Sequence, residues 1–262
     1  MSELRFKLAI FKELPFIITH LGKARRMIRE TDKYSSEDRF SFAASIMDRM
    51  RKSAKTSTLV YGMESLPSEG GYVMYSNHQG RYDGIGILSS FGKPCRALWK
   101  KSAADYIVAR ECAGLIEAKI IDVENELLDT LRKINQIAKE VRDENRIYLI
   151  FPEGYYKDNK NTLQEFKSGC FRCSSKSQTP IVPICLYDSW KSMNQGLFKG
   201  KVTTQIHYLD PIPYEDYKDM KDTEIAEMVK SKIQERIDLI NSGKFEGTPS
   251  KILGKIKSNP LD

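Results

Sequence analysis

The stretch from Glu124 to Phe151, ENELLDTLRKINQIAKEVRDENRIYLIF, joins a helix pattern directly to a strand pattern. In its first part, apolar residues recur at helical spacing and line one face, at positions 127, 128, 131, 134, 137 and 141. Its last part, Arg146 to Phe151, is the short apolar run of a buried strand. The stretch therefore predicts a helix over 124–143 that leads into a strand buried on both faces.

The rest of the chain repeats this alternation of helix and strand patterns. Helices are expected over 36–55, 84–90, 101–112 and 223–240, and strands over 56–61, 71–76, 95–99, 180–187 and 202–208. Alternating elements predict an α/β fold with a mostly parallel central sheet flanked by helices. Sites in such sheets form at the carboxyl ends of the strands, so segments that follow strands are the first candidates for function.

The length of 262 residues fits one large domain with extensions, and we assign residues 36–240 to that domain. Residues 1–35 mix apolar and basic types around Pro15, which interrupts the apolar pattern. They predict an N-terminal helical segment that either lies on an anionic bilayer or packs as a helix pair on the domain. Residues 241–262 are expected to form a basic, mobile tail.

The net charge is +7, which favours polyanionic partners such as a membrane surface. No nucleic-acid-binding motif accompanies the charge, so no nucleic acid partner is expected. No run approaches the ~18–20 apolar residues of a membrane-spanning helix. Five cysteines without a secretory leader indicate reduced thiols, and the lone pair Cys170 and Cys173 does not predict zinc. We therefore expect a cytoplasmic protein, peripheral on the inner face of a membrane.

The segment Asn77 to Asp83, NHQGRYD, follows the expected strand 71–76 and holds a histidine five positions before an aspartate. His78 at a strand exit can face a cleft, and Asp83 on the first turn of the next helix can reach back to its ring. An imidazole oriented by a carboxylate is what a general base needs. A structural hydrogen-bonded pair is the alternative, and the chain's other two histidines have no such neighbour.

A second motif, Phe151-Pro152-Glu153-Gly154, follows the strand 146–151 at once. Pro152 and Gly154 impose a tight turn that would aim Glu153 at the crevice beside His78. A plain strand exit with a solvated glutamate is the alternative for this tetrapeptide alone. The two motifs together are stronger evidence, because both follow strands and can share one edge of the sheet.

Through these motifs the chain resembles the glycerolipid acyltransferase family, of the 1-acylglycerol-3-phosphate O-acyltransferase type. The family's first block is Asn-His-x4-Asp, and its third is Phe-Pro-Glu-Gly. The blocks that follow are Phe-Lys-x-Gly, which here contains Lys167 and Gly169, and a Val-Pro strand, which here contains Pro183. A basic pair that opens a helix in the family resembles Lys100 and Lys101. The matched order covers roughly residues 70–190.

Two blocks depart from the family pattern. The third commonly continues Thr-Arg-Ser, where this chain has Tyr155-Tyr156-Lys157, and the second commonly ends Phe-Ile-Asp-Arg, where this chain has residues 120–123, IIDV. The resemblance implies that those arginines hold the acceptor's phosphate, and neither Tyr nor Val can form the bidentate fork of an arginine. Lys157 and Arg81 are the expected substitutes, and the identity of the acceptor stays open.

The resemblance implies transfer of a fatty acyl group from a thioester of coenzyme A or acyl carrier protein to a hydroxyl of a lysolipid-like acceptor. His78 would remove the hydroxyl proton, and Asp83 would orient the ring and stabilise the imidazolium. The expected acceptor-binding residues are Arg81, Glu153, Gly154 and Lys157, and the expected phosphate contacts are Lys100 and Lys101. No metal or cofactor is expected. Hydrolysis of the thioester and a non-catalytic lipid-binding role are the alternatives.

Overall fold

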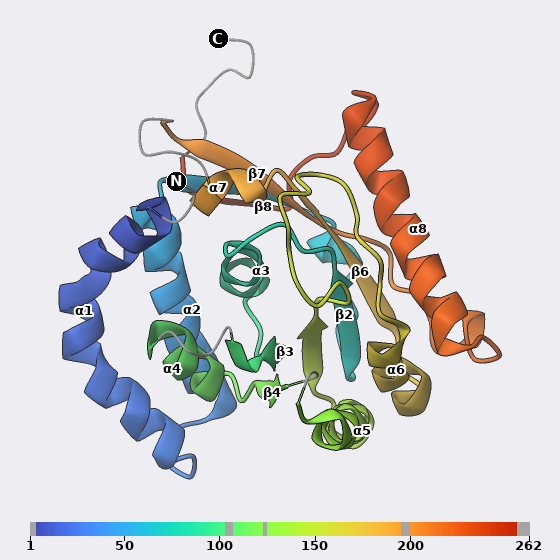
Figure 1. Ribbon diagram of the computed structural model, residues 1–262, viewed down its shortest axis with the longest axis horizontal. Helices are drawn as coiled ribbons and strands as arrows, with labels where there is room; N and C mark the ends of the chain where they lie inside the picture. Colours follow the sequence, from blue (N-terminus) through green and yellow to red (C-terminus); the bar gives the residue numbers. More distant parts are fainter. Residues whose placement is uncertain (1–3, 103–106, 123–124, 195–199, 256–262) are drawn as a thin grey trace.

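The computed structural model describes residues 4–102, 107–122, 125–194 and 200–255. Its strands are β1 (Thr56–Tyr61), β2 (Tyr72–Ser76), β3 (Arg96–Lys100), β4 (Lys119–Ile121), β5 (Ile147–Ile150), β6 (Ile181–Tyr187), β7 (Val202–Tyr208) and β8 (Lys251–Leu253). They form one sheet in the order β4-β3-β5-β2-β6-β7-β1-β8 (Figure 1). Neighbours from β4 to β6 are parallel, whereas β7 runs antiparallel to β6 and β8 antiparallel to β1. The predicted mostly parallel α/β class is confirmed.

Helices cover both faces of this sheet. They are α1 (Leu4–Arg29), α2 (Ser36–Ser53), α3 (Asp83–Phe91), α4 (Ile107–Leu115), α5 (Leu127–Asp143), α6 (Arg172–Ser177), α7 (Trp190–Asn194) and α8 (Asp222–Asn241). Figure 1 shows α1 to α4 on one side and α5, α6 and α8 on the other. Each side forms its own apolar core with the sheet residues that face it.

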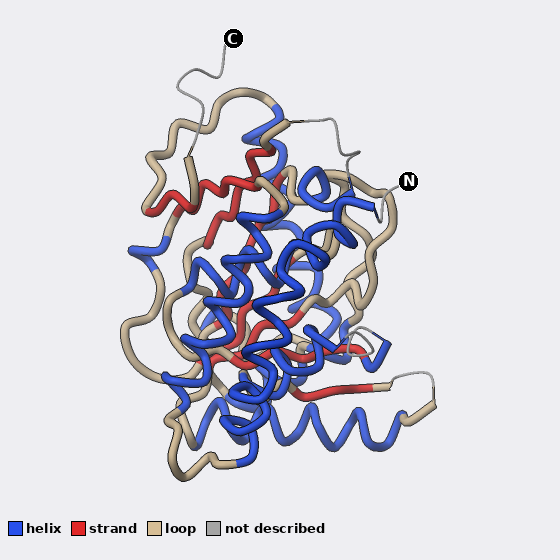
Figure 2. Tube along the Cα trace, turned by 90° about the vertical axis from the view of Figure 1, so that its left-hand side faces the viewer, coloured by secondary structure: helices blue, strands red, loops and turns tan. Residues whose placement is uncertain are grey.

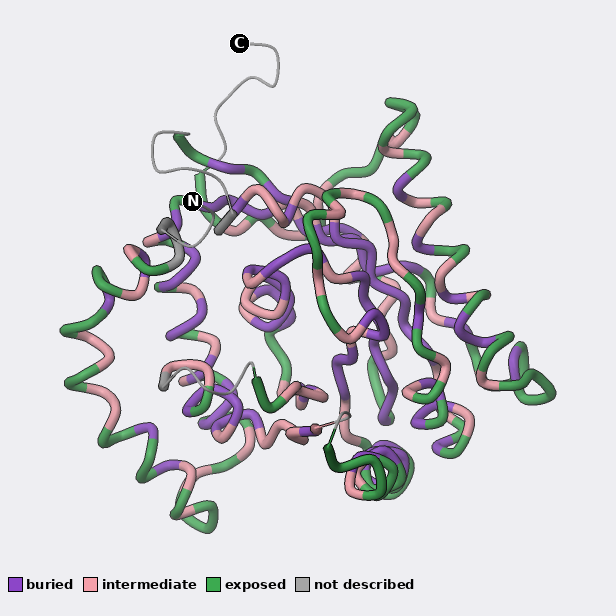
Figure 3. The backbone as a smooth tube through the Cα atoms, viewed as in Figure 1, coloured by how far each residue is buried: buried purple, intermediate pink, exposed green. Residues whose placement is uncertain are grey.

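The central strand β2 shows why the predicted strands are continuous apolar runs in the sequence. Tyr72 and Met74 point into the core under α2 and α3, whereas Val73 and Tyr75 point into the core under α5 and α6. All four are fully buried, because a parallel strand with helices on both faces has no side open to water. Figure 3 shows this buried centre with exposed residues on the outer helix faces.

The predicted N-terminal helical segment is confirmed, but it is a single helix that continues through Pro15 and not a helix pair. Its inner face packs on the domain, with Ala24 and Met27 in the same core as α2. Near its start, Glu13 accepts a hydrogen bond from Arg49 of α2 at 2.7 Å. Figure 2 shows α1 lying across the outer side of the other helices. The proline is exposed, and the hydroxyl of Thr19 donates to its carbonyl at 2.9 Å.

Three other segments differ from expectation. The predicted mobile tail contains β8, whose residues pair with β1, and the tail beyond residue 255 lies outside the described residues. The three-residue strand β4 was not predicted, because it is too short to show a period. The described part of the helix expected over 101–112 is Ile107–Leu115, and Lys100 closes β3 instead of opening a helix. Residues 103–106 lie outside the described part. No described helix is both long and apolar enough to cross a bilayer.

Candidate active site

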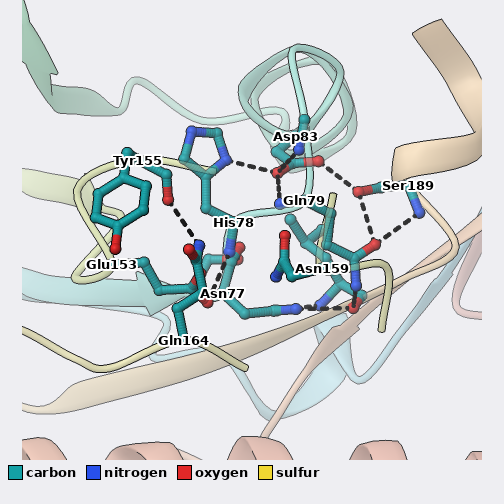
Figure 4. A network of polar contacts seen from close by, with 12 residues as sticks. Asn77, His78, Gln79, Asp83, Glu153, Tyr155, Asn159, Gln164 and Ser189 are labelled. Carbon is teal, nitrogen blue, oxygen red and sulfur yellow. Dashed lines mark hydrogen bonds and ion pairs between the residues drawn. The ribbon is translucent and has the colours of Figure 1, made fainter. Parts of the chain in front are cut away.

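The parallel pairing of β5, β2 and β6 brings both sequence motifs to one edge of the sheet. Tyr75 of β2 pairs with Ile150 of β5, and Ser76 pairs with Ile184 of β6. The segments that follow these strands therefore emerge side by side, as the sequence predicts for carboxyl ends of parallel strands. Figure 4 shows the polar network that they form.

His78 and Asp83 meet as the sequence predicts. The Nδ1 atom of His78 lies 2.6 Å from Oδ2 of Asp83. The backbone N–H groups of Gln79 and Gly80 donate to the same oxygen, at 2.5 and 2.9 Å. Asp83 is the first residue of α3 and is fully buried, whereas the His78 side chain keeps 18% of its surface exposed. Because Nδ1–H donates to a carboxylate, the ring presents its Nε2 lone pair, which is the form of a general base.

Aromatic side chains fix the plane of the His78 ring. Phe151, the first residue after β5, stacks on it with ring centroids 4.4 Å apart. Tyr156 meets it edge-on, with centroids 4.7 Å apart and planes at 74°. The third block therefore supplies the packing surface of the histidine, and Tyr156 occupies a position where the family commonly has arginine.

Asn77 extends the pairing of β2 and β6 beyond the strands. Its side-chain amide donates to the carbonyl of Leu186 at 3.0 Å, and its amide oxygen accepts the N–H of Leu186 at 2.7 Å. With these two bonds, the Asn77 side chain takes the place of the next β2 residue in the hydrogen-bond ladder with β6. The backbone can therefore turn away from the sheet while His78 stays in position. Among the described contacts, Asn77 therefore has a structural role, because it holds the end of β2 to β6.

Glu153 lies behind the histidine. One carboxylate oxygen accepts the backbone N–H of His78 at 3.1 Å, and the other accepts Nε2 of Gln164 at 2.5 Å. The side chain is fully buried, and this burial raises the pKa of Glu153 above 4.5, against the hydrogen bonds from Gln164 and His78, which lower it. The carboxylate has no exposed surface for an acceptor here. Its contact with the acceptor stays a prediction, and the geometry gives it the role of supporting His78.

Gly154 and two lysines form the outer wall near Glu153. Gly154 has φ of +71°, a conformation that favours glycine, and a Cβ atom there would lie 3.3 Å from Nζ of Lys167. The ammonium groups of Lys157 and Lys167 lie over the exposed ring of Tyr155, 5.3 and 5.6 Å from its centroid. The segment beside the third block therefore carries two cations close to one aromatic ring.

The other predicted basic residues take separate positions. Arg81 lies between His78 and Asp83 in the chain and is half-buried. Lys100 closes β3, two strands from β2 in the sheet. The ammonium of Lys101 lies 3.5 Å from Asp122 and 3.4 Å from Glu126, and these carboxylates raise the pKa of Lys101. The phosphate contacts expected of these residues stay predictions.

The sequence motifs do not indicate several polar residues that complete the network. Ser189 donates from its hydroxyl to Oδ1 of Asp83, and its N–H donates to Oε1 of Gln79 at 3.0 Å. Gln79 in turn donates to Asn161 at 3.1 Å. Ser189 belongs to no block used above, and its place just after β6 was the only signal that could have indicated it.

The chain is thus an α/β protein with a mostly parallel sheet, in which a buried aspartate contacts a histidine at the carboxyl edge. A family model described as Acyltransferase matches residues 57–187, half of the chain. The chain belongs to the acyltransferase family.

Curated relatives agree with this assignment. A putative 1-acyl-sn-glycerol-3-phosphate acyltransferase of Caenorhabditis elegans is 27% identical over 158 residues, 60% of this chain and 55% of that protein. The human 1-acyl-sn-glycerol-3-phosphate acyltransferase alpha is 29% identical over 164 residues, also 60% of this chain and 55% of that protein. A chloroplastic relative of Brassica napus is 29% identical over 192 residues, 70% of this chain and 52% of that protein. The chain spans about half the length of the curated relatives it matches.

A solved structure shares the fold. The crystal structure of the 1-acyl-sn-glycerophosphate acyltransferase PlsC from Thermotoga maritima superposes with a TM-score of 0.70 at 14% identity, covering 92% of this chain and 98% of that one. At this identity the likeness shows the arrangement of helices and strands. It includes regions outside the family match, because 92% of the chain is covered.

Proposed function

We propose that this protein transfers a fatty acyl group from an acyl thioester to a hydroxyl of a lysophospholipid-like acceptor. The observation that carries the proposal is the 2.6 Å contact between His78 and the buried Asp83, in a chain of the acyltransferase family. The relatives named above act, by their names, on 1-acyl-sn-glycerol 3-phosphate. An acceptor with a glycerol backbone and a phosphate-bearing head group is therefore the first candidate.

In the proposed reaction, Nε2 of His78 takes the proton of the acceptor hydroxyl as its oxygen attacks the thioester carbonyl. Asp83 stabilises the imidazolium that forms. The tetrahedral intermediate then collapses, its carbon–sulfur bond breaks, and the imidazolium returns the proton to the departing thiolate. The products are the acylated acceptor and the free thiol of coenzyme A or acyl carrier protein. The nucleophile is the substrate's own hydroxyl, so no acyl-enzyme is formed.

The acceptor's phosphate is proposed to meet the basic rim beside the third block. Lys157 is exposed there, next to Gly154 and Lys167, and Arg81 lies in the first block itself. Lysine binds phosphate as a point charge, without the two-pronged geometry of an arginine. We therefore expect looser selection among phosphate-bearing head groups. Lys100 and Lys101 are proposed to contact phosphates of the donor or the acceptor.

A membrane surface is the proposed location, because both substrates carry acyl chains. Three exposed apolar residues of α1, Phe11, Leu14 and Ile18, follow one another at helical spacing. A second exposed group at the start of α5 comprises Leu127, Leu128 and Leu131. The N-terminal half of α1 packs on the end of α2 that leads into β1, and α5 follows the carboxyl end of β4. Both groups therefore lie at the edge of the sheet that carries His78, and they fit shallow contact with an anionic bilayer.

The test is an acyl-transfer assay with a radiolabelled acyl thioester and a panel of lysolipid acceptors, run in parallel with wild type, His78→Ala and His20→Ala. His20 lies on α1, outside the site, and is the matched control. We expect an acylated lipid from wild type and from His20→Ala, and a loss of ~10²–10⁴-fold in His78→Ala. Full activity in His78→Ala contradicts the proposed base. Labelled free acid at a rate independent of acceptor identifies a hydrolase instead.

A further inference from the structure

Asp83 makes one contact that a simple histidine–aspartate pair does not require. The hydroxyl of Ser189 donates to Oδ1 of Asp83, whereas the other oxygen, Oδ2, faces His78 (Figure 4). Ser189 lies just before α7, 106 positions after Asp83, and is 2% exposed. The two oxygens of the carboxylate are thus held by parts of the chain that come together only in the folded sheet.

The direction of the Ser189 hydroxyl follows from its neighbours. Its oxygen lies 3.1 Å from Oε1 of Gln79, but that atom already accepts the backbone N–H of Ser189 at 3.0 Å. The Gln79 amide cannot be flipped without loss, because its Nε2 donates to the carbonyl of Leu186 at 2.9 Å. Both neighbours of the hydroxyl are therefore acceptors. Its single proton goes to the nearer and charged one, which is Asp83.

A further residue holds Gln79 in place. Nε2 of Gln79 also donates to Oδ1 of Asn161, at 3.1 Å. That Asn161 oxygen accepts the backbone N–H of Asp188 at 2.8 Å, and the Asn161 amide donates to the Asp188 carboxylate at 3.0 Å. Asp188 is itself paired with Lys191 at 2.6 Å. These contacts set which end of the Gln79 and Asn161 side-chain amides donates and which accepts. Ser189 is therefore held by Gln79 on one side and by Asp83 on the other.

We propose that Ser189 is a positioning residue for the acyl transfer, acting through Asp83; the inference rests on the function proposed above. Its hydroxyl anchors Oδ1 so that Oδ2 stays directed at Nδ1 of His78. It also stabilises the ionised form of a carboxylate that has no access to water. Asp83 is thus held through one oxygen by Ser189 and holds His78 through the other. Ser189 itself does not touch substrate in this proposal.

Removal of the hydroxyl has a defined kinetic signature. In Ser189→Ala, the buried Oδ1 of Asp83 loses its donor, so Oδ2 is no longer held toward Nδ1 of His78. We expect kcat/KM to fall about 10–100-fold, mainly through kcat. If Ser189 acted through packing alone, a cysteine of similar shape in its place would keep the kcat of wild type.

The experiment compares kcat and KM of wild type, Ser189→Ala, Ser189→Cys and Ser192→Ala, with a thermal melt of each. Ser192 is the matched control, because it is fully buried three positions further on, in α7, and its hydroxyl lies 2.6 Å from that of Thr56. We expect Ser192→Ala to keep the kcat of wild type. Ser189→Cys keeps the shape of serine with a weak donor, and its kcat is expected to fall like that of Ser189→Ala. If the alanine variant does not fold, the cysteine variant decides.

Two results overturn the inference while the proposed function stands. The first is an active wild type whose Ser189 variants both keep its kcat/KM. The second is a Ser189→Ala variant that loses activity while Ser189→Cys keeps it, which assigns Ser189 to packing. A wild type without any acyl transfer instead contradicts the proposed function itself, and the same assay separates these cases.

Discussion

Asp83→Asn is expected to separate the charge of the aspartate from its role in orienting the histidine. In the structure, the backbone N–H groups of Gln79 and Gly80 both donate to Oδ2. An asparagine placed there turns its amide oxygen toward these two donors, because its NH₂ group would face two other donors. That oxygen still accepts Nδ1–H of His78, and the NH₂ group meets the hydroxyl oxygen of Ser189, which can accept. The tautomer of the ring is therefore kept.

What the variant loses is the negative charge beside the imidazolium. Two unit charges about 4 Å apart, at an effective dielectric constant of about 20, attract each other by about 4 kcal/mol. If this attraction is present only once the imidazolium forms, its loss lowers the rate about a thousandfold. Asp83→Ala is expected to lose more, because it also leaves the donors of Gln79, Gly80 and Ser189 without an acceptor in a buried site.

The assay is kcat/KM for acyl transfer by wild type, Asp83→Asn, Asp83→Ala and His78→Ala, with thermal melts to confirm folding. We expect Asp83→Asn to retain more activity than Asp83→Ala. An asparagine variant as inactive as Asp83→Ala refutes the argument that the two backbone donors fix the amide. An asparagine variant with wild-type activity refutes stabilisation of the imidazolium by charge.

Three further outcomes follow from the structure. Burial raises the pKa of Glu153 above 4.5, so the stability this group contributes is complete below pH 4.5 and is lost as the pH rises through the raised pKa. The Tm of wild type minus the Tm of Glu153→Gln should therefore fall as the pH rises above 4.5. A value that does not change with pH contradicts this. Replacing Phe11 and Ile18 of α1 by serine should reduce co-sedimentation with anionic vesicles, whereas Ile252→Ser, an exposed change on β8, should not. Ile137→Ala, fully buried under the sheet, should lower the free energy of unfolding in urea by about 2–5 kcal/mol, and a loss below about 1 kcal/mol would indicate a collapsed cavity.

The parts of the fold that the sequence predicts are those with local signals. The α5–β5 unit follows from its apolar spacing, and the pair His78–Asp83 follows from a separation that one turn can span. Lys119–Ile121 is too short for any period, and Pro15 has no sequence feature that distinguishes a continued helix from a broken one. These local patterns set what kind of element forms, and they do not set how elements pair.

Contacts across the sheet could not be predicted in the same way. Ser189 reaches Asp83 only because β6 pairs with β2 in one register, and a shift by one residue would turn it to the other face. The burial of Glu153 has the same origin, since the turn after β5 lies against the turn after β2. Sequence reasoning placed Glu153 near His78, but it did not predict that the side chain is fully buried and accepts from the backbone of His78.

The distance along the chain between His78 and its supports also has a consequence for synthesis. Glu153, Leu186 and Ser189 contact the first block from 75, 109 and 106 positions away. At about 5–20 residues per second, a ribosome needs about 5–20 s to add them after the motif has been made. A nascent chain with a complete Asn-His-x4-Asp segment therefore lacks an ordered base until β6 docks beside β2. Recovered catalytic activity is thus a reporter of finished sheet assembly, and it should appear with the last of the central strands during refolding.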